Sequence, residues 1–388
     1  MIMNQVLWTL GVCLVGEDLW FTSAEFDGLF RADMKTGRVT FVSRIGVWDK
    51  QQKFGFSCIV NVDNSLFLCP FYADCICRYD LQNHKVQCFP VELETAPCVN
   101  RAACFHGKIY MFCDELRLVL VFDVKTGEIS YIYESIHESP DIKYSFHIAC
   151  DIACRKEFFY FARGSKVIET DACFQMISEY DVSKYSEGEE IATVALYKET
   201  FWMICGKTKL LSWNRKNNEV CSYKIPELGN AYRSIINNHY LYVLYPDTNY
   251  ILIVNLENMD AAEIHRKQFG SQDGERRVFL PFLKQGDDGI FAYSYIDSGI
   301  HHIKPDGEAE CVPLYMEHLH EFLMEYQRYE FGTKDFLSYE NGNYLDSLGF
   351  FLDCIGVRHA EGESEYSGSG EAIYKKIKEN MDNQDDTI

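Results

Sequence analysis

Positive charge is scarce in this chain. Its 388 residues include 37 Lys and Arg against 58 Asp and Glu, a formal net charge of −21. Proteins that hold a nucleic-acid backbone or dock on an anionic membrane surface do so through clustered Lys and Arg. The deficit therefore argues against nucleic acid as a partner, and it leaves proteins and carbohydrate-like ligands as the expected partners of an acidic, soluble chain.

Long hydrophobic runs are also missing. No stretch of 18 apolar residues occurs, so no membrane span is expected. Residues 1–5 carry no positive charge, and the short apolar stretch after them soon meets Glu17 and Asp18, which predicts no signal peptide. Many of the 16 Cys fall inside apolar runs, as reduced thiols do in a reducing compartment. Together these patterns predict a cytoplasmic location.

Motifs for metal binding and catalysis are absent as well. There is no Cys-x-x-Cys pair, and the nearest groupings are Cys75 with Cys77 and Cys150 with Cys154. Two Cys are too few for a metal site. No Gly-x-Ser-x-Gly, His-Glu-x-x-His or phosphate-loop motif appears. We therefore expect no metal and no cofactor, and the inventory leans away from an enzyme.

What the chain does have is a repeat. An apolar run, a polar turn and a second apolar run ending at Asp or Asn recur seven times, with copies 40 to 49 residues apart. A strand-based period of this length is typical of a radial repeat protein. The repeat predicts an all-β fold, a seven-bladed β-propeller over residues 1–315. The first residues of the copies, called anchors below, are Leu19, Leu66, Ile109, Phe158, Phe201, Leu241 and Ile290.

An Asp or Asn stands 13 or 14 residues after the anchor in the first six copies, and Lys304 takes that place in the seventh. Such a side chain accepts hydrogen bonds from the backbone N–H groups that follow it in a turn. Asp33 and Asp123 begin Asp-x-x-Thr-Gly turns, in which Gly supplies positive φ. These residues are predicted to be structural.

The Asp-x-x-Thr-Gly strand–turn–strand pattern resembles the kelch-type and quinoprotein-type β-propellers. The resemblance covers residues 1–315 at the level of the repeat. The double Gly of a kelch unit and the Trp after the Thr-Gly turn of quinoprotein repeats are absent, since Arg38-Val39 and Glu128-Ile129 follow the turns here. The resemblance therefore implies a fold and carries over no catalytic residue.

Four strands per blade require an inner strand before each anchor and an outer strand after each turn. Apolar segments fill both places in every copy, and residues 1–7 are left over as a segment that could close the ring. The expected inner strands are 8–15, 55–61, 98–105, 146–152, 191–196, 231–236 and 278–283.

Residues 316–388 differ in pattern. Apolar residues at helical spacing, beginning with Met316, predict two short helices and a third near the end, joined by a flexible acidic linker at 357–370. This α-helical C-terminal extension either packs on the propeller or binds a partner.

Candidate binding residues lie on the inner strands. Arg101 and Arg233 each stand eight residues before an anchor, so a shared register directs both toward the channel; Asn100 and His147 are close in register. Two Arg there could bind a carboxylate or phosphate bidentately, or could pair with acidic residues of neighbouring blades.

Three long loops join an outer strand to the next inner strand, and therefore share one mouth of the channel. They carry Trp48 and His137 as candidate recognition residues. His301 and His302 are adjacent on one strand, so they point to opposite faces and do not form a joint site.

Two functions remain open from the sequence. One is a non-catalytic binding or scaffold module that recognises a protein or saccharide-like ligand through one mouth of the channel. The alternative is a propeller enzyme, a lyase or hydrolase on a sugar or cyclic peptide, with its site in the channel.

Overall fold

The computed structural model describes residues 9–23, 26, 28–45, 55–113, 116, 118–133, 147–149, 159–171, 175–258, 264–268, 279–284, 286–294, 299–318 and 322. It divides into two compact units, Asn4–Glu317 and a second unit of Met1–Met3 with His318–Ile388. Of the second unit only His318 and Phe322 are described. None of the described helices is long and apolar enough to cross a bilayer.

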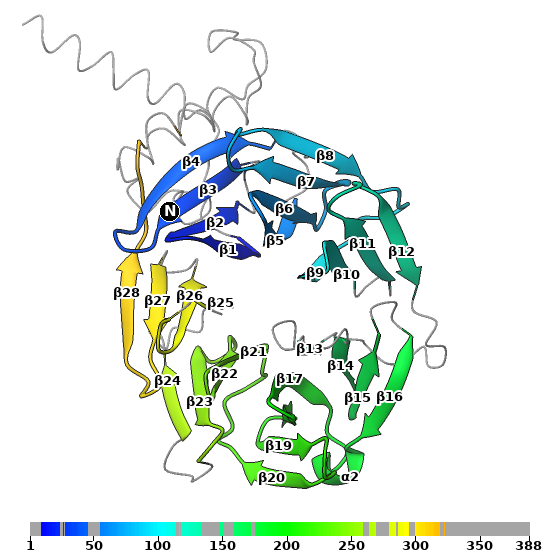
Figure 1. Ribbon diagram of the computed structural model, residues 1–388. Helices are drawn as coiled ribbons and strands as arrows, with labels where there is room; N and C mark the ends of the chain where they lie inside the picture. Colours follow the sequence, from blue (N-terminus) through cyan, green and yellow to red (C-terminus); the bar gives the residue numbers. More distant parts are fainter. Residues whose placement is uncertain are drawn as a thin grey trace, which may run out of the picture. The chain divides into compact units, whose positions relative to one another are not determined.

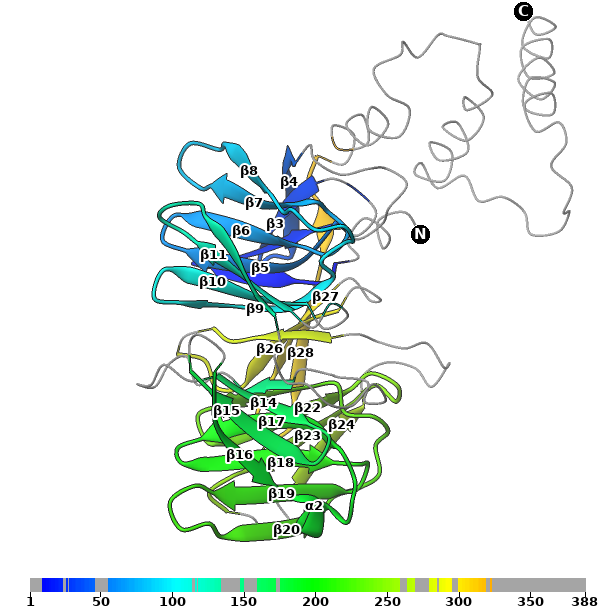
Figure 2. The same cartoon turned by 90° about the vertical axis from the view of Figure 1, so that its right-hand side faces the viewer.

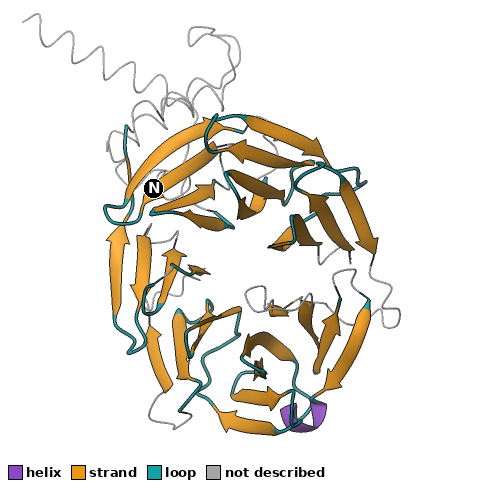
Figure 3. Ribbon diagram, viewed as in Figure 1, coloured by secondary structure: helices purple, strands orange, loops and turns teal. Residues whose placement is uncertain are grey.

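Within the described part of Asn4–Glu317, the strands form seven sheets; each contains four strands consecutive in sequence, and the first has a fifth strand as well. Every neighbouring pair within such a set of four is antiparallel. The sheets stand around a common centre (Figure 1), and Figure 2 views the same ring from its side. Strands dominate the coloured ribbon of Figure 3. The all-β propeller predicted from the repeat is confirmed.

Each sheet is called a blade below, numbered in chain order. The strands of blades 1 to 4 are β1 Val12–Val15, β2 Asp18–Thr22, β3 Gly28–Asp33, β4 Arg38–Arg44; β5 Phe56–Val62, β6 Ser65–Pro70, β7 Cys75–Asp80, β8 Val86–Pro90; β9 Val99–Phe105, β10 Lys108–Cys113, β11 Leu118–Asp123, β12 Ile129–Tyr133; β13 His147–Ala149, β14 Phe159–Arg163, β15 Lys166–Thr170 and β16 Met176–Asp181.

The strands of blades 5 to 7 follow the same plan, with the short helix α2 Ser183–Ser186 between β16 and β17. They are β17 Ile191–Tyr197, β18 Thr200–Cys205, β19 Lys209–Asn214, β20 Val220–Lys224; β21 Arg233–Asn237, β22 Tyr240–Tyr245, β23 Tyr250–Asn255, β24 Ile264–Gln268; β25 Phe279–Phe282, β26 Ile290–Ser294, β27 Gly299–Ile303 and β28 Ala309–Pro313. The first strand of each blade lies nearest the centre in Figure 1.

The core lies between neighbouring blades. The second and third strands are covered on both faces, so they read as continuous apolar runs; β6, for example, is buried along its whole length. Side chains of blade 5, such as Trp202, pack with Leu241 and Leu252 of blade 6. Burial of large apolar side chains on both faces is the main force that holds such blades together.

A buried ion pair joins blades 4 and 5. The carboxylate of Glu169 is 5% exposed and lies 3.2 Å from Nη2 of Arg215. It also accepts hydrogen bonds from the hydroxyls of Tyr160, Ser178 and Tyr180. Because these donors satisfy the carboxylate, its charge is tolerated away from water.

The turn residues take the structural role predicted for them. Oδ1 of Asp123 accepts from the N–H groups of Lys125 and Thr126 at 2.9 and 3.0 Å. Asp33, Asp80, Asn214 and Asn255 accept in the same way from the residues two or three positions on. In the seventh copy, where Lys304 stands, Asp306 accepts from Glu308 instead.

A fifth strand links the last blade to the first. After β28 the chain enters β29, Tyr315–Met316, which pairs in parallel with Arg38 and Val39 at the outer edge of β4. The N–H of Tyr315 donates to the carbonyl of Gly37 at 2.9 Å, and that of Glu317 donates to Val39 at 2.7 Å. The link covers a strand edge that would otherwise be open to other chains.

The structure tests only part of what the sequence predicts for the two ends of the chain. Met316, expected as the first apolar residue of a helix, lies in β29 instead, because the β4 edge offers it backbone partners and buries its side chain. The remaining predicted helices, the linker at 357–370 and the closing role of residues 1–7 lie outside the described residues.

Candidate functional site in the central channel

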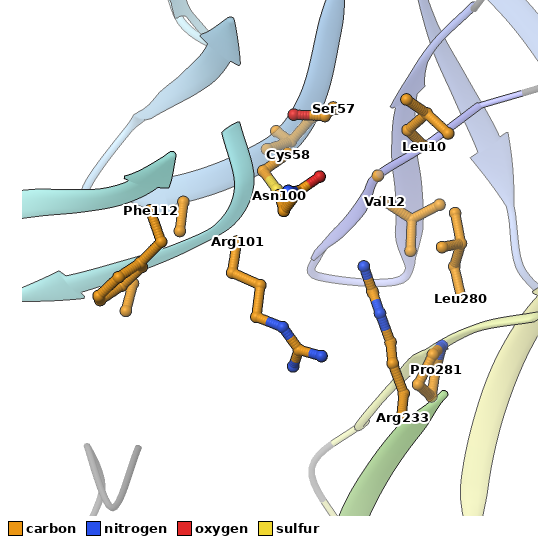
Figure 4. Close-up of a pocket in the computed structure, with 14 residues that line it drawn as sticks. Leu10, Val12, Ser57, Cys58, Asn100, Arg101, Phe112, Arg233, Leu280 and Pro281 are labelled. Atoms are coloured by element: carbon orange, nitrogen blue, oxygen red, sulfur yellow. The ribbon is translucent and has the colours of Figure 1, made fainter. Parts of the chain in front are cut away.

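A cavity of about 280 Å³ lies where the inner strands begin. Blades 1, 2, 3, 6 and 7 all contribute to its wall, so it belongs to the central channel (Figure 4). Its lining consists of Leu10, Gly11, Val12, Ser57, Cys58, Ile59, Asn100, Arg101, Ala102, Ala103, Phe112, Arg233, Leu280 and Pro281.

The two predicted arginines both line this cavity. Arg101 is the third residue of β9 and pairs across the strand with Phe112, whereas Arg233 is the first residue of β21 and pairs with Leu244. Figure 4 shows both guanidinium groups extending into the same space from different blades. The shared register eight residues before the anchor thus corresponds to a shared orientation.

The Arg233 side chain packs against the ring of the preceding residue, Tyr232. Its guanidinium carbon lies 5.3 Å from the centroid of the Tyr232 ring, a cation–π contact that orients the side chain. Among the described residues, no carboxylate lies within ion-pairing distance of Arg233, and its buried Nε has no hydrogen-bond partner there. A buried donor without a partner favours an incoming acceptor.

The walls of the channel differ in charge from the rest of the chain. The seven inner strands, β1, β5, β9, β13, β17, β21 and β25, contain no Asp, Glu or Lys, although the chain carries 58 acidic residues. Arg101 and Arg233 are the two arginines on these strands. The inner strands therefore offer positive charge inside an acidic protein.

The Cys58 thiol lies on the same wall. Burial raises its pKa, and the positive charges of Arg233 and Arg101 partly oppose that increase. Both guanidinium groups therefore act electrostatically on the same point of the channel. Since the burial effect is the larger, Cys58 stays a neutral thiol rather than a thiolate nucleophile.

The remaining predicted site residues are only partly described. Asn100 lines the cavity beside Arg101. His147 begins β13 and pairs with Ala162, and its side chain lies outside the described part of the structure. Trp48 and His137, the candidates on the mouth loops, also lie outside the described residues. His301 and His302 contact different partners, Cys311 at 3.8 Å and the ring of Phe291 at 4.4 Å.

Sequence reasoning missed part of the cavity wall. Gly11 and Cys58 also stand eight residues before their anchors, Leu19 and Leu66, and both line the cavity. Applying the register rule to every blade, rather than only to charged residues, would have found them. Ser57, whose hydroxyl donates to the carbonyl of Val99, joins blades 2 and 3 at the same level.

No family model and no curated protein sequence matches the chain. Solved structures match over most of the chain. A streptogramin B lyase has 11% sequence identity and a TM-score of 0.53 over 78% of this chain and 93% of that one. Hydrazine synthase from Kuenenia stuttgartiensis has 13% identity and a TM-score of 0.55 over 77% and 96%. BamB from Moraxella catarrhalis has 9% identity and a TM-score of 0.50 over 77% of this chain and 86% of that one.

These proteins differ widely in their names and share the propeller. At such low identity the likeness concerns the fold alone. The chain is therefore an all-β propeller similar in fold to these proteins, and its function has to be argued from its own residues.

Proposed function

We propose that this propeller is a binding module that holds a small anionic ligand in its central channel, between Arg101 and Arg233, without chemical conversion. The observation that carries the proposal is the convergence of two arginines from blades 3 and 6 on one cavity. The inner strands contain no Asp or Glu, and the buried Nε of Arg233 has no hydrogen-bond partner among the described residues, so an anion from solution suits this cavity.

The size of the cavity limits the ligand. About 280 Å³ lies at the lower end of the volumes of ligand sites, which suits a molecule of monosaccharide size. Asn100 adds an amide that can donate or accept a hydrogen bond beside Arg101. A sugar bearing a phosphate or a carboxylate combines a negative charge for the two arginines with hydroxyl groups that can form hydrogen bonds with Asn100. An acidic sugar is therefore the ligand class that we propose.

The chemistry of the wall favours binding over catalysis. A thiol whose pKa is raised is a poor nucleophile at neutral pH, so Cys58 does not supply covalent catalysis. A guanidinium stays protonated throughout the physiological range and does not act as a general base. Arg101 and Arg233 thus recognise and hold an anion.

Calorimetric titration tests the proposal. We would titrate the protein with glucose 6-phosphate, glucuronate, inorganic phosphate and neutral glucose. We expect one site for an acidic sugar and none for glucose. Arg101→Ala and Arg233→Ala should each weaken binding by roughly 10- to 100-fold, the effect of losing a charged hydrogen-bond donor.

Arg31→Ala is the matched control, because it removes one positive charge at an exposed position beside Asp18. It should leave the affinity unchanged. Equal affinity in the two channel variants and the parent protein would contradict the proposal. Chromatography of the mixture after the titration shows whether a sugar has been converted. Conversion would instead favour the propeller lyase or hydrolase.

A further inference from the structure

Three cysteines meet on the outer half of blade 2, away from the channel residues discussed above. Cys75 and Cys77 lie two residues apart on β7, so they point to the same face of the sheet. Cys88 stands directly opposite Cys77 on β8. The sequence shows the first two as a pair, and only the register of β7 against β8 adds the third.

The sulfur atoms lie close to one another. The Sγ atoms of Cys75 and Cys77 are 3.6 Å apart, and those of Cys77 and Cys88 are 3.5 Å apart. All three lie within 4.8 Å of each other, and none is in a disulfide bond. Metal–thiolate bonds of about 2.3 Å place the sulfur atoms of one site roughly 3.8 to 4.0 Å apart, which the cluster reaches with small adjustments.

The surroundings suit a soft ion. Cys75 and Cys77 are 4% and 0% exposed and pack among apolar side chains of blades 1 and 2, such as Leu29 and Ala73. Cys88 is half-buried, which leaves a route for an ion to enter and one side of the site near water. Thiolate ligands in such a setting select soft metals over hard, oxygen-seeking ones.

We propose that the thiolates of Cys75, Cys77 and Cys88 bind one soft metal ion of low coordination number, with Cu(I) as the chemical type. Three sulfur donors match the trigonal coordination of Cu(I). Structural zinc instead requires four ligands, and the group among the described residues has three.

The metal ligand is the thiolate, so each thiol must lose its proton when the ion binds. Binding therefore releases protons, and the affinity should rise with pH.

The test is anaerobic competition for Cu(I) against a coloured Cu(I) chelator, on the full chain. We expect one tightly held ion per chain and X-ray absorption with three sulfur neighbours at about 2.3 Å. Cys88→Ser should weaken this site by more than about 100-fold, since even outer partners of metal ligands contribute 10- to 100-fold.

Cys221→Ser is the matched control. Cys221 is also half-buried on the last strand of its blade, and it faces Ser212 rather than another cysteine. The Cys221→Ser variant should keep the ion, and circular dichroism should show that Cys221→Ser and Cys88→Ser are both folded. Cu(I) should also raise the melting temperature of the parent protein and not that of Cys88→Ser.

Three outcomes would overturn the proposal. One is equal retention of the ion by Cys88→Ser and the parent protein. Another is displacement of Cu(I) by equimolar Zn²⁺, which would mean a four-coordinate site. The third is a Cys77–Cys88 disulfide in the protein purified anaerobically without added reductant, visible as a mass 2 Da below that of the fully reduced chain, since it would consume two of the three ligands.

Discussion

Single Asp and Asn residues organise the turns of this propeller through their side-chain oxygens. Hydrogen bonds from the N–H groups of Thr126 and Lys125 lower the pKa of Asp123, because they stabilise the ionised carboxylate. Similar bonds lower the pKa of Asp33 and Asp80. Asn214 makes the same kind of turn with an amide oxygen that does not titrate.

This difference predicts a pH dependence. A carboxylate with a lowered pKa in the folded state stabilises the fold above its unfolded pKa of about 3.9, and that contribution is lost as the pH falls through the folded pKa. Asp123→Asn should therefore melt below the parent protein at pH 6. The gap should close as the pH falls from about 4 to about 2.5, in thermal melts at constant ionic strength.

The reverse exchange is the control. Asn214→Asp should add acid sensitivity to a turn that lacks it, and the melting temperature of this variant should fall faster than the parent's below pH 4. A constant gap between Asp123→Asn and the parent at every pH would mean that charge plays no part in the turn.

Among the elements, β29 and the turn before β4 depend on one glycine. Gly37 has φ of +74°, and a Cβ added there would lie 2.0 Å from the carbonyl oxygen of Pro313, at the end of β28. Gly127 ends the equivalent turn of blade 3 with φ of +76°, but a Cβ there would meet only the Phe89 ring, at 2.8 Å. A side chain can turn aside where a backbone carbonyl cannot.

Gly37→Ala should therefore be the more damaging of two matched substitutions. Both variants carry the backbone strain of a left-handed alanine, about 1–2 kcal/mol. Gly37→Ala should cost about 1–3 kcal/mol more, because it also displaces the strand that joins the last blade to the first. Urea unfolding measures both variants. Equal losses would mean that the β28–β29 connection contributes little to stability.

The strands also show which parts of the fold could be predicted from the sequence. Strand order was predictable because each blade is built from consecutive residues with a repeated pattern, and β5, β9 and β17 begin within one residue of their expected starts. The parallel pairing of Tyr315 with Arg38 was not predictable, since it joins segments far apart in sequence by backbone groups alone.

The candidate sites show the same limit. Arg101 and Arg233 were identified because both stand at one offset from an anchor, and the structure brings them to one cavity. Cys88 was missed because its closeness to Cys77 depends on the register of β7 against β8, which the spacing of the cysteines does not contain.

For the whole molecule, net charge is the dominant electrostatic feature. A chain with a formal charge of −21 repels itself when compact. Raising the salt concentration from about 10 mM to about 200 mM shortens the screening length from about 30 Å to about 7 Å. We expect the melting temperature at pH 7 to rise by a few degrees over this range.

The same titration with NaCl at pH 4.5, where part of the carboxylates are protonated, provides the comparison. The salt effect should be smaller there, since less charge remains to be screened. A melting temperature that falls with salt at pH 7 would mean that attractive pairs of exposed charges, such as Lys198 with Glu257, outweigh the net repulsion.

The link between β29 and β4 also bears on how the chain folds during translation. Each blade uses only consecutive residues, so it can form soon after it leaves the ribosome. The outer edge of β4, made among the first 44 residues, must wait for Tyr315 and Met316 before it gains its last partner. For most of synthesis the first blade therefore lacks a strand partner that it has in the finished fold, and its edge stays open to other chains until the last blade has been made.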